Sequence, residues 1–139
     1  MRDNPVLRIV AKIIIPVILL FALYVQFHGD FGPGGGFQAG VIFAAGFILY
    51  GLVFGTEALR NAIPPGLLRF VIALGLVLYA GVGATTMLLG SDYLAYGALA
   101  DDLIGGQHLG IFLVELGVGI TVSAVTVPIF LAFAGRNDP

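Results

Sequence analysis

The sequence predicts an all-α membrane protein with four transmembrane helices, and three observations lead to this prediction. The mean hydropathy of the 139 residues is +1.06, and only 10% of them are charged. A soluble domain of this size needs more polar surface to cover its core. Four separate segments are also apolar over about 20 residues each, the length that a helix needs to cross the hydrocarbon core of a bilayer.

The four segments are predicted at Val6–Phe27, Phe37–Gly55, Leu67–Leu89 and Leu109–Ala134. The first is too long for the apolar region of a signal peptide, and no small-residue cleavage site follows it, so we interpret it as a retained helix. Together the segments predict one four-helix transmembrane domain over residues 1–139, in a multi-pass protein of the cytoplasmic membrane.

The cations predict how the helices are oriented in the membrane. All of them lie at the two ends of the chain or in and beside the loop over residues 57–66: Arg2, Arg8, Lys12, Arg60, Arg69 and Arg136. The other two loops contain none and instead have the acidic residues Asp30, Asp92, Asp101 and Asp102. The positive-inside rule therefore predicts that both termini and the 57–66 loop are cytoplasmic.

The composition argues against several classes of function. A net charge of −2 gives no indication of a nucleic-acid partner. The absence of cysteine excludes a disulfide framework, a thiolate metal site and a cysteine nucleophile. The two histidines lie far apart in the sequence, and no nucleotide-binding, hydrolase or metalloprotease motif is present. We therefore expect no enzymatic activity, no cofactor and no resident metal.

Glu115 is an ionisable residue in the middle of the fourth apolar segment. It lies in GIFLVELGVGI, where its neighbours are apolar residues and glycine. An ionisable side chain at membrane depth costs free energy, and such a residue is a candidate for function by default. Two roles are open for Glu115. It is either a group that takes up and releases protons, or a structural carboxylate that hydrogen-bonds to a neighbouring helix or subunit.

His108, Thr126 and Lys12 are further ion-path candidates. His108 precedes Glu115 by seven residues and Thr126 follows it by eleven, so at about 100° per residue the three lie on one helix face. This stripe is a candidate hydrated path for a proton or a cation. The alternative for His108 is a helix-capping role in the outer headgroup region. Lys12, in the first segment, also suits anchoring at the cytoplasmic interface through its long side chain.

The stretch HGDFGPGGGFQAG, residues 28–40, separates the first two segments and contains six glycines. Glycine is costly to order, so the backbone here must need conformations or close contacts that other residues do not allow. Phe31 and Phe37 flank the glycines and favour a packed turn. We expect this turn, at the outer face, to pack against other helices and a partner protein.

The stretch FHGDFGPGGGFQAGVIFAAGFIL resembles the signature of the MnhB/MrpB family, a His-Gly pair followed by Pro-Gly-Gly-Gly-Phe-Gln-x-Gly leading into a helix. The matching residues are His28, Gly29, Pro33, Gly34, Gly35, Gly36, Phe37, Gln38 and Gly40. The family often has glycine where this chain has Ala39. The later stretch GIFLVELGVGITVSA resembles the family's last span, with Glu115 in place.

The resemblance implies a small accessory subunit of a multisubunit Mrp-type Na⁺/H⁺ antiporter, with a role in assembly or in an ion path. Its partners would be the other subunits and the lipid bilayer, and the complex would transport Na⁺ and H⁺. One alternative is the homologous subunit of a membrane-bound hydrogenase or a related redox-driven complex. Another is a stand-alone small transporter, whose complete ion path would have to fit within four helices.

Overall fold

The computed structural model describes residues 4–29 and 32–135. Four long helices are each long and apolar enough to cross a membrane, and the described residues contain no strand. The long helices are α1 (Pro5–His28), α2 (Gly36–Phe54), α4 (Pro65–Leu88) and α5 (Leu103–Ala134), and the short ones are α3 (Thr56–Ala62) and the 3₁₀ helix η1 (Tyr96–Leu99). The prediction of an all-α protein with four membrane-spanning helices is confirmed.

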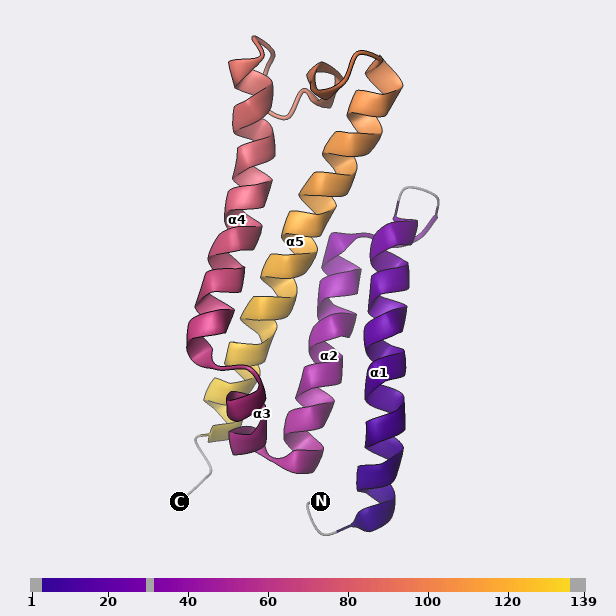
Figure 1. Cartoon of the computed structure of the whole chain (residues 1–139), viewed down its shortest axis with the longest axis vertical. Helices are drawn as coiled ribbons and strands as arrows, with labels where there is room; N and C mark the ends of the chain where they lie inside the picture. The colour runs from indigo at the N-terminus through magenta and orange to yellow at the C-terminus, as the bar shows by residue number, and fades with distance from the viewer. Residues whose placement is uncertain (1–3, 30–31, 136–139) are drawn as a thin grey trace.

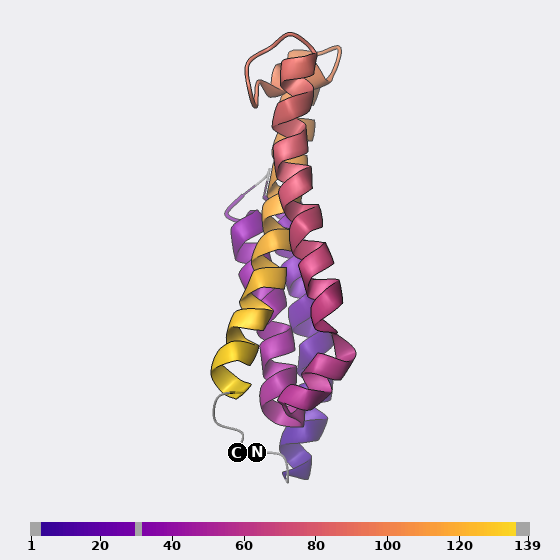
Figure 2. The same ribbon diagram turned by 90° about the vertical axis from the view of Figure 1, so that its left-hand side faces the viewer.

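The four long helices lie side by side in the order α4, α5, α2, α1 (Figure 1). Helix α5 packs against α4 on one side and α2 on the other, and α1 packs mainly against α2. Seen from the edge, the helices lie largely behind one another (Figure 2). The array is therefore flat, and many large apolar side chains are exposed, as expected for surfaces that face lipid or another membrane protein.

The bounds of α1, α2 and α4 agree with the prediction to within two residues, whereas α5 begins six residues earlier than predicted. The predicted start at Leu109 treated the glycines of this region as loop. In the structure, the Asp102 side chain accepts a hydrogen bond of 2.8 Å from the Gly105 N–H and caps the helix. With 32 residues, α5 is about 48 Å long, well beyond the hydrocarbon thickness.

The amino end of α1 and the carboxyl end of α5 lie at the same end of the array (Figure 1). This end carries Arg8, Arg60 and Arg69, while the opposite loop carries Asp92, Asp101 and Asp102. The separation of charge along the sequence is thus also a separation in space. Arg2, Asp30, Phe31 and Arg136 lie outside the described residues. Which end faces the cytoplasm stays a prediction of the positive-inside rule.

The two hairpins are offset along the membrane normal: α4 and α5 reach well past the turn between α1 and α2 (Figure 1). The turn meets α5 at Glu115, twelve residues after Leu103, which is about 18 Å along the helix axis from the amino end of α5. This offset places the glycine turn beside the middle part of α5.

The apolar core lies toward the end of the array that contains the chain termini. There α2, α4 and α5 meet over the short helix α3, which supplies the fully buried Leu59. The other buried members of this cluster are Ala44, Leu68, Ala124, Val127 and Leu131. This core fixes α2 against α5 and so sets the position at which the turn meets Glu115.

Candidate functional site

Glu115 lies against the glycine turn that joins α1 to α2. A Cβ atom added at Gly29 would lie 2.5 Å from Glu115 Oε2, and one added at Gly35 would lie 3.2 Å from Oε1. At Gly36, an added Cβ would overlap the backbone carbonyl of Glu115. The three glycines therefore surround Glu115: a side chain at Gly36 would overlap its backbone, and one at Gly29 or Gly35 would displace its carboxylate from this position.

The carboxylate of Glu115 also lies beside the amino end of α2. Gly35 immediately precedes this helix, and its φ of 138° belongs to a region that glycine adopts without steric strain. The first N–H groups of a helix have no intrahelical acceptor and carry partial positive charge, so a carboxylate beside them is stabilised. The amino end of α2 thus supplies a favourable potential for a negative charge on Glu115.

Two more glycines of the motif hold the turn and α2 in close contact with their neighbours. A Cβ at Gly34 would lie 2.9 Å from the backbone oxygen of Val25 on α1. A Cβ at Gly40 would lie 2.8 Å from the backbone oxygen of Gly119 on α5. The motif therefore extends the close approach of α2 to α5 by one helical turn beyond Glu115.

The remaining motif residues lie at the edge of the turn. His28 ends α1 and stacks on the ring of Tyr24, with the ring centroids 5.2 Å apart. Pro33, Phe37 and Gln38 are exposed. Within this chain Phe37 does not pack against the turn, because 62% of its surface is exposed, and its packing against a partner protein stays a prediction. The glycines make the close contacts of the turn, and the Phe37 ring points outward.

His108 and Thr126 lie on either side of Glu115 along α5, but in different surroundings. His108 is exposed, about 10 Å from Glu115 along the helix axis and beyond the α1–α2 turn. Thr126 is half-buried and donates a hydrogen bond of 2.7 Å to the carbonyl of Val122 in its own helix. The capping role considered for His108 is wrong, because Asp102 caps α5 and His108 lies in the second turn.

Lys12 lies far from this site. It is exposed on α1, seventeen residues before Gly29, which corresponds to about 25 Å along the helix axis. The structure therefore does not bring Lys12 to Glu115. The described residues also contain no group of three or more His, Cys, Asp or Glu side chains that could hold a metal ion.

Gln26 is a polar residue of this region that sequence reasoning missed. It lies on α1, one turn before Gly29, and only 6% of its surface is exposed. Its side-chain oxygen lies close to Gly119, where an added Cβ would come within 2.5 Å. Among the described residues, its Nε2 atom has no hydrogen-bond partner. The sequence feature that could have pointed to this residue is a glutamine near the end of an apolar segment, two residues before His28.

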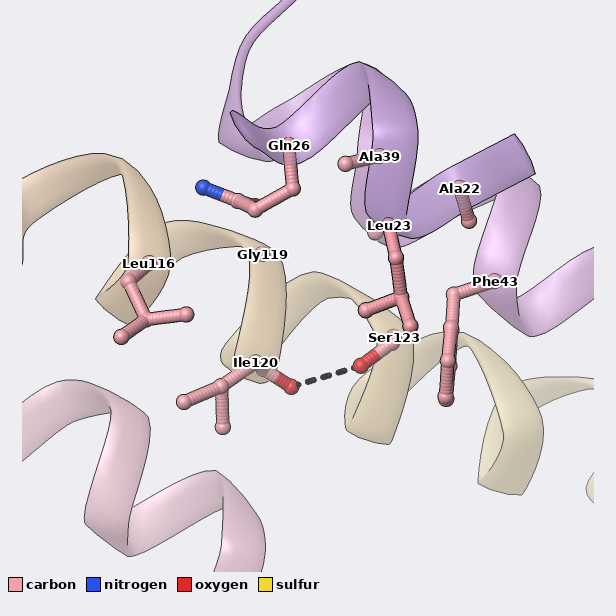
Figure 3. Close-up of a pocket in the computed structure, with 10 residues that line it drawn as sticks. Ala22, Leu23, Gln26, Ala39, Phe43, Leu116, Gly119, Ile120 and Ser123 are labelled. Carbon is pink, nitrogen blue, oxygen red and sulfur yellow. Dashed lines mark hydrogen bonds between the residues drawn. The ribbon is translucent and has the colours of Figure 1, made fainter. Parts of the chain in front are cut away.

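Gln26 lines a cavity of about 120 Å³ between α1, α2 and α5 (Figure 3). In the figure, the amide nitrogen points toward the turn of α5 that carries Leu116, the residue after Glu115. Ser123 lies on the opposite side and donates a hydrogen bond of 3.0 Å to the carbonyl of Ile120. Apart from Gln26 and Ser123, the side chains that line the cavity are apolar.

Comparison with known proteins identifies sequences similar to this chain over its whole length. A family model described as a domain related to the MnhB subunit of Na⁺/H⁺ antiporter matches residues 6–139. A Staphylococcus haemolyticus protein named "Putative antiporter subunit mnhB2" is 35% identical over 144 residues, covering 99% of this chain and 100% of that protein.

Two further relatives have the same name and nearly the same similarity. The Staphylococcus epidermidis protein is 34% identical over 143 residues, and the Staphylococcus aureus protein is 33% identical over 142 residues. Each match covers 99% of this chain and 100% of the relative. Together with the four apolar helices, these matches establish a multi-pass protein of the cell membrane, and the chain belongs to the MnhB family.

Proposed function

We propose that this chain is a membrane subunit of a multisubunit Na⁺/H⁺ antiporter and that Glu115 takes part in coupling the movement of the two ions. The observation that supports the role of Glu115 is its position. The carboxylate lies between Gly29 and Gly35, beside the amino end of α2, in a chain that otherwise has apolar helices. The names of the relatives favour an antiporter over a hydrogenase-type complex.

The geometry also suits a group that changes its charge. The first N–H groups of α2 lie beside the carboxylate, and the neighbours of Glu115 along α5 are apolar residues and glycine. An ionisable side chain in such a position at membrane depth is a candidate for ion coupling. A purely structural carboxylate, which holds α2 or another subunit in place, is the second candidate role.

Replacing Glu115 with glutamine in the intact complex separates these roles. Glutamine retains the size of the side chain and its hydrogen-bonding capacity, but it does not titrate. We expect normal amounts of assembled complex and a Na⁺/H⁺ exchange rate below about a tenth of that of the wild type, because the titrating group at membrane depth is lost. Exchange is measured in membrane vesicles as the sodium-dependent change of an imposed pH gradient.

The matched control is Glu57→Gln, the same substitution at an exposed carboxylate in the first turn of α3. It should retain exchange at close to the wild-type rate. If Glu115→Gln assembles and exchanges ions at the wild-type rate and with the wild-type pH profile, then Glu115 is not part of ion coupling. If the variant complex fails to assemble, the structural role is favoured instead.

We further propose that residues 1–139 form one transmembrane domain with both termini in the cytoplasm. The clustering of Arg8, Arg60 and Arg69 at one end of the array supports this orientation. We also propose that the chain has no enzymatic activity of its own and contributes to transport only within the assembled complex, whose other subunits are its partners.

A further inference from the structure

The buried amide of Gln26 is a polar group that the fold leaves incomplete. The side chain is 6% exposed, and among the described residues its Nε2 atom has no hydrogen-bond partner. A buried N–H donor without an acceptor is costly, so native proteins supply a partner, which is often an ordered water molecule. The cavity of about 120 Å³ beside Gln26 is where such a partner would lie.

The chemistry of the cavity indicates which small molecule fits. Gln26 presents an N–H donor, and the Ser123 oxygen, whose proton is directed to the Ile120 carbonyl, retains acceptor capacity. A ligand that serves both groups must accept a hydrogen bond from the amide and be able to donate one to the hydroxyl oxygen. Water does both, whereas a sodium ion would be repelled by the amide donor. One water needs about 10–15 Å³ of such space, so the cavity has room for water beside its two polar side chains.

The cavity lies one helical turn from Glu115. Gln26 contacts Gly119, four residues after Glu115 on α5, and it precedes Gly29, which contacts the Glu115 carboxylate, by three residues on α1. The two spacings correspond to about 6 Å and about 4.5 Å along the helix axes. One or two water molecules, at about 2.8 Å per hydrogen bond, are enough to join the amide to the carboxylate.

We propose that the cavity between α1, α2 and α5 is a hydration site, in which Gln26 and Ser123 hold water that reaches Glu115 from the side of the chain termini. Gln26 is a positioning residue, because it acts by orienting water. The inference rests on the proposed role of Glu115 and extends it, since a titrating carboxylate at membrane depth requires a route by which protons reach it.

Cysteine reactivity tests this proposal directly, because the chain contains no cysteine. Ser123→Cys places a single thiol in the cavity, and thiols react as thiolates, which form in contact with water. The control is Ala73→Cys on the exposed face of α4. Gly75 of α4 lies against Thr121 of α5. Ala73 and Ser123 each lie two residues from this contact, toward the end of the array that contains the chain termini. The two thiols are therefore at similar positions along the array.

The assembled complex in membranes is treated with 2-aminoethyl methanethiosulfonate, and the mass of this subunit reports the extent of the reaction. We expect Cys at position 123 to react at least about tenfold faster than Cys at position 73. Equally slow reactions at the two positions would show that the cavity is dry and would overturn the proposal. If Ser123→Cys does not assemble, Ala39→Cys, which lines the same cavity, replaces it.

A second substitution tests the role of Gln26. Adding Gln26→Leu to Ser123→Cys should slow labelling at least about fivefold, because an apolar side chain removes the donor that holds the water. Adding Gln107→Leu, at an exposed glutamine of α5, should leave the rate unchanged. An unchanged rate with Gln26→Leu would refute the assignment to Gln26. Labelling does not depend on exchange, so a failure here is distinct from a failure of the Glu115 proposal.

Discussion

Replacing Gly36 with alanine should separate α2 from α5 at the position of Glu115. A Cβ at Gly36 would lie 2.8 Å from the carbonyl carbon of Glu115 and 3.0 Å from its Cα, and closer still to its carbonyl oxygen. These are backbone atoms of a helix, so no side-chain rotation can relieve the overlap. Relieving the carbon contact to 3.4 Å would require the helices to move apart by about 0.6 Å, and the closer carbonyl oxygen requires more than this.

Two opposing effects determine the magnitude of the change. In a helix interior, alanine is favoured over glycine by about 1 kcal/mol, and at Gly36, the first residue of α2, the gain is no larger than this. Introducing a methyl group into a well-packed interface costs about 1–3 kcal/mol, and a gap of 0.5–1 Å forfeits a quarter to a half of each dispersion contact. The cost exceeds the gain, and we expect a net loss of about 1–2 kcal/mol in the stability of the α2–α5 contact.

The assay compares Gly36→Ala with Gly81→Ala, a helical glycine of α4 with no atom within 4 Å of an added Cβ. The midpoint of thermal unfolding of the purified complex and the Na⁺/H⁺ exchange rate are measured for both variants. Gly36→Ala should lower both quantities, and Gly81→Ala should keep or raise the stability. Equal behaviour of the two variants would refute the reasoning that close backbone approach at Gly36 holds α2 to Glu115.

Three further predictions test other parts of the structure. Gly35→Val should reduce exchange or assembly, because a β-branched residue at a φ of 138° is strained by about 1–3 kcal/mol, and the yield and exchange rate of the complex measure this. Thr86→Val should destabilise the protein by about 1–3 kcal/mol in thermal unfolding, because the Leu94 N–H loses its hydrogen-bond acceptor. The control Thr85→Val should be nearly neutral, because Thr85 is exposed and its hydroxyl donates only to the Gly81 carbonyl of the same helix. A reporter that functions only in the cytoplasm should be active when it is fused to the C-terminus. Activity of a reporter that functions only in the periplasm would reverse the predicted orientation.

The existence and order of the four long helices could be predicted from the sequence because hydropathy over about 20 residues is a direct consequence of the bilayer thickness. The start of α5 could not be predicted in this way. Gly105 and Gly106 suggest a loop by composition, yet they are helical because Asp102 caps the helix and η1 packs closely over Gly106. A tertiary contact here overrides the local propensity of glycine.

The partners of Glu115 were also beyond reach from the sequence. Hydropathy locates each apolar segment but says nothing about the offset between two hairpins along the membrane normal. The sequence therefore indicated a glycine turn at the outer face and a carboxylate inside a helix as two separate features. The offset of the hairpins (Figure 1) brings them into contact. His108, seven residues before Glu115 on α5, is exposed.

Gly29, Gly35 and Gly36 are explained by this contact and not by a need for flexibility. A flexible loop would tolerate serine or asparagine at most positions, and a simple turn needs glycine only where φ is positive, as at Gly35. Gly29 and Gly36 do not have positive φ, yet an added Cβ at Gly36 would overlap the backbone of Glu115, and one at Gly29 would displace its carboxylate. Their entropic cost is offset by the room that they leave for a carboxylate at the amino end of α2, so the turn and Glu115 pack as one structural unit.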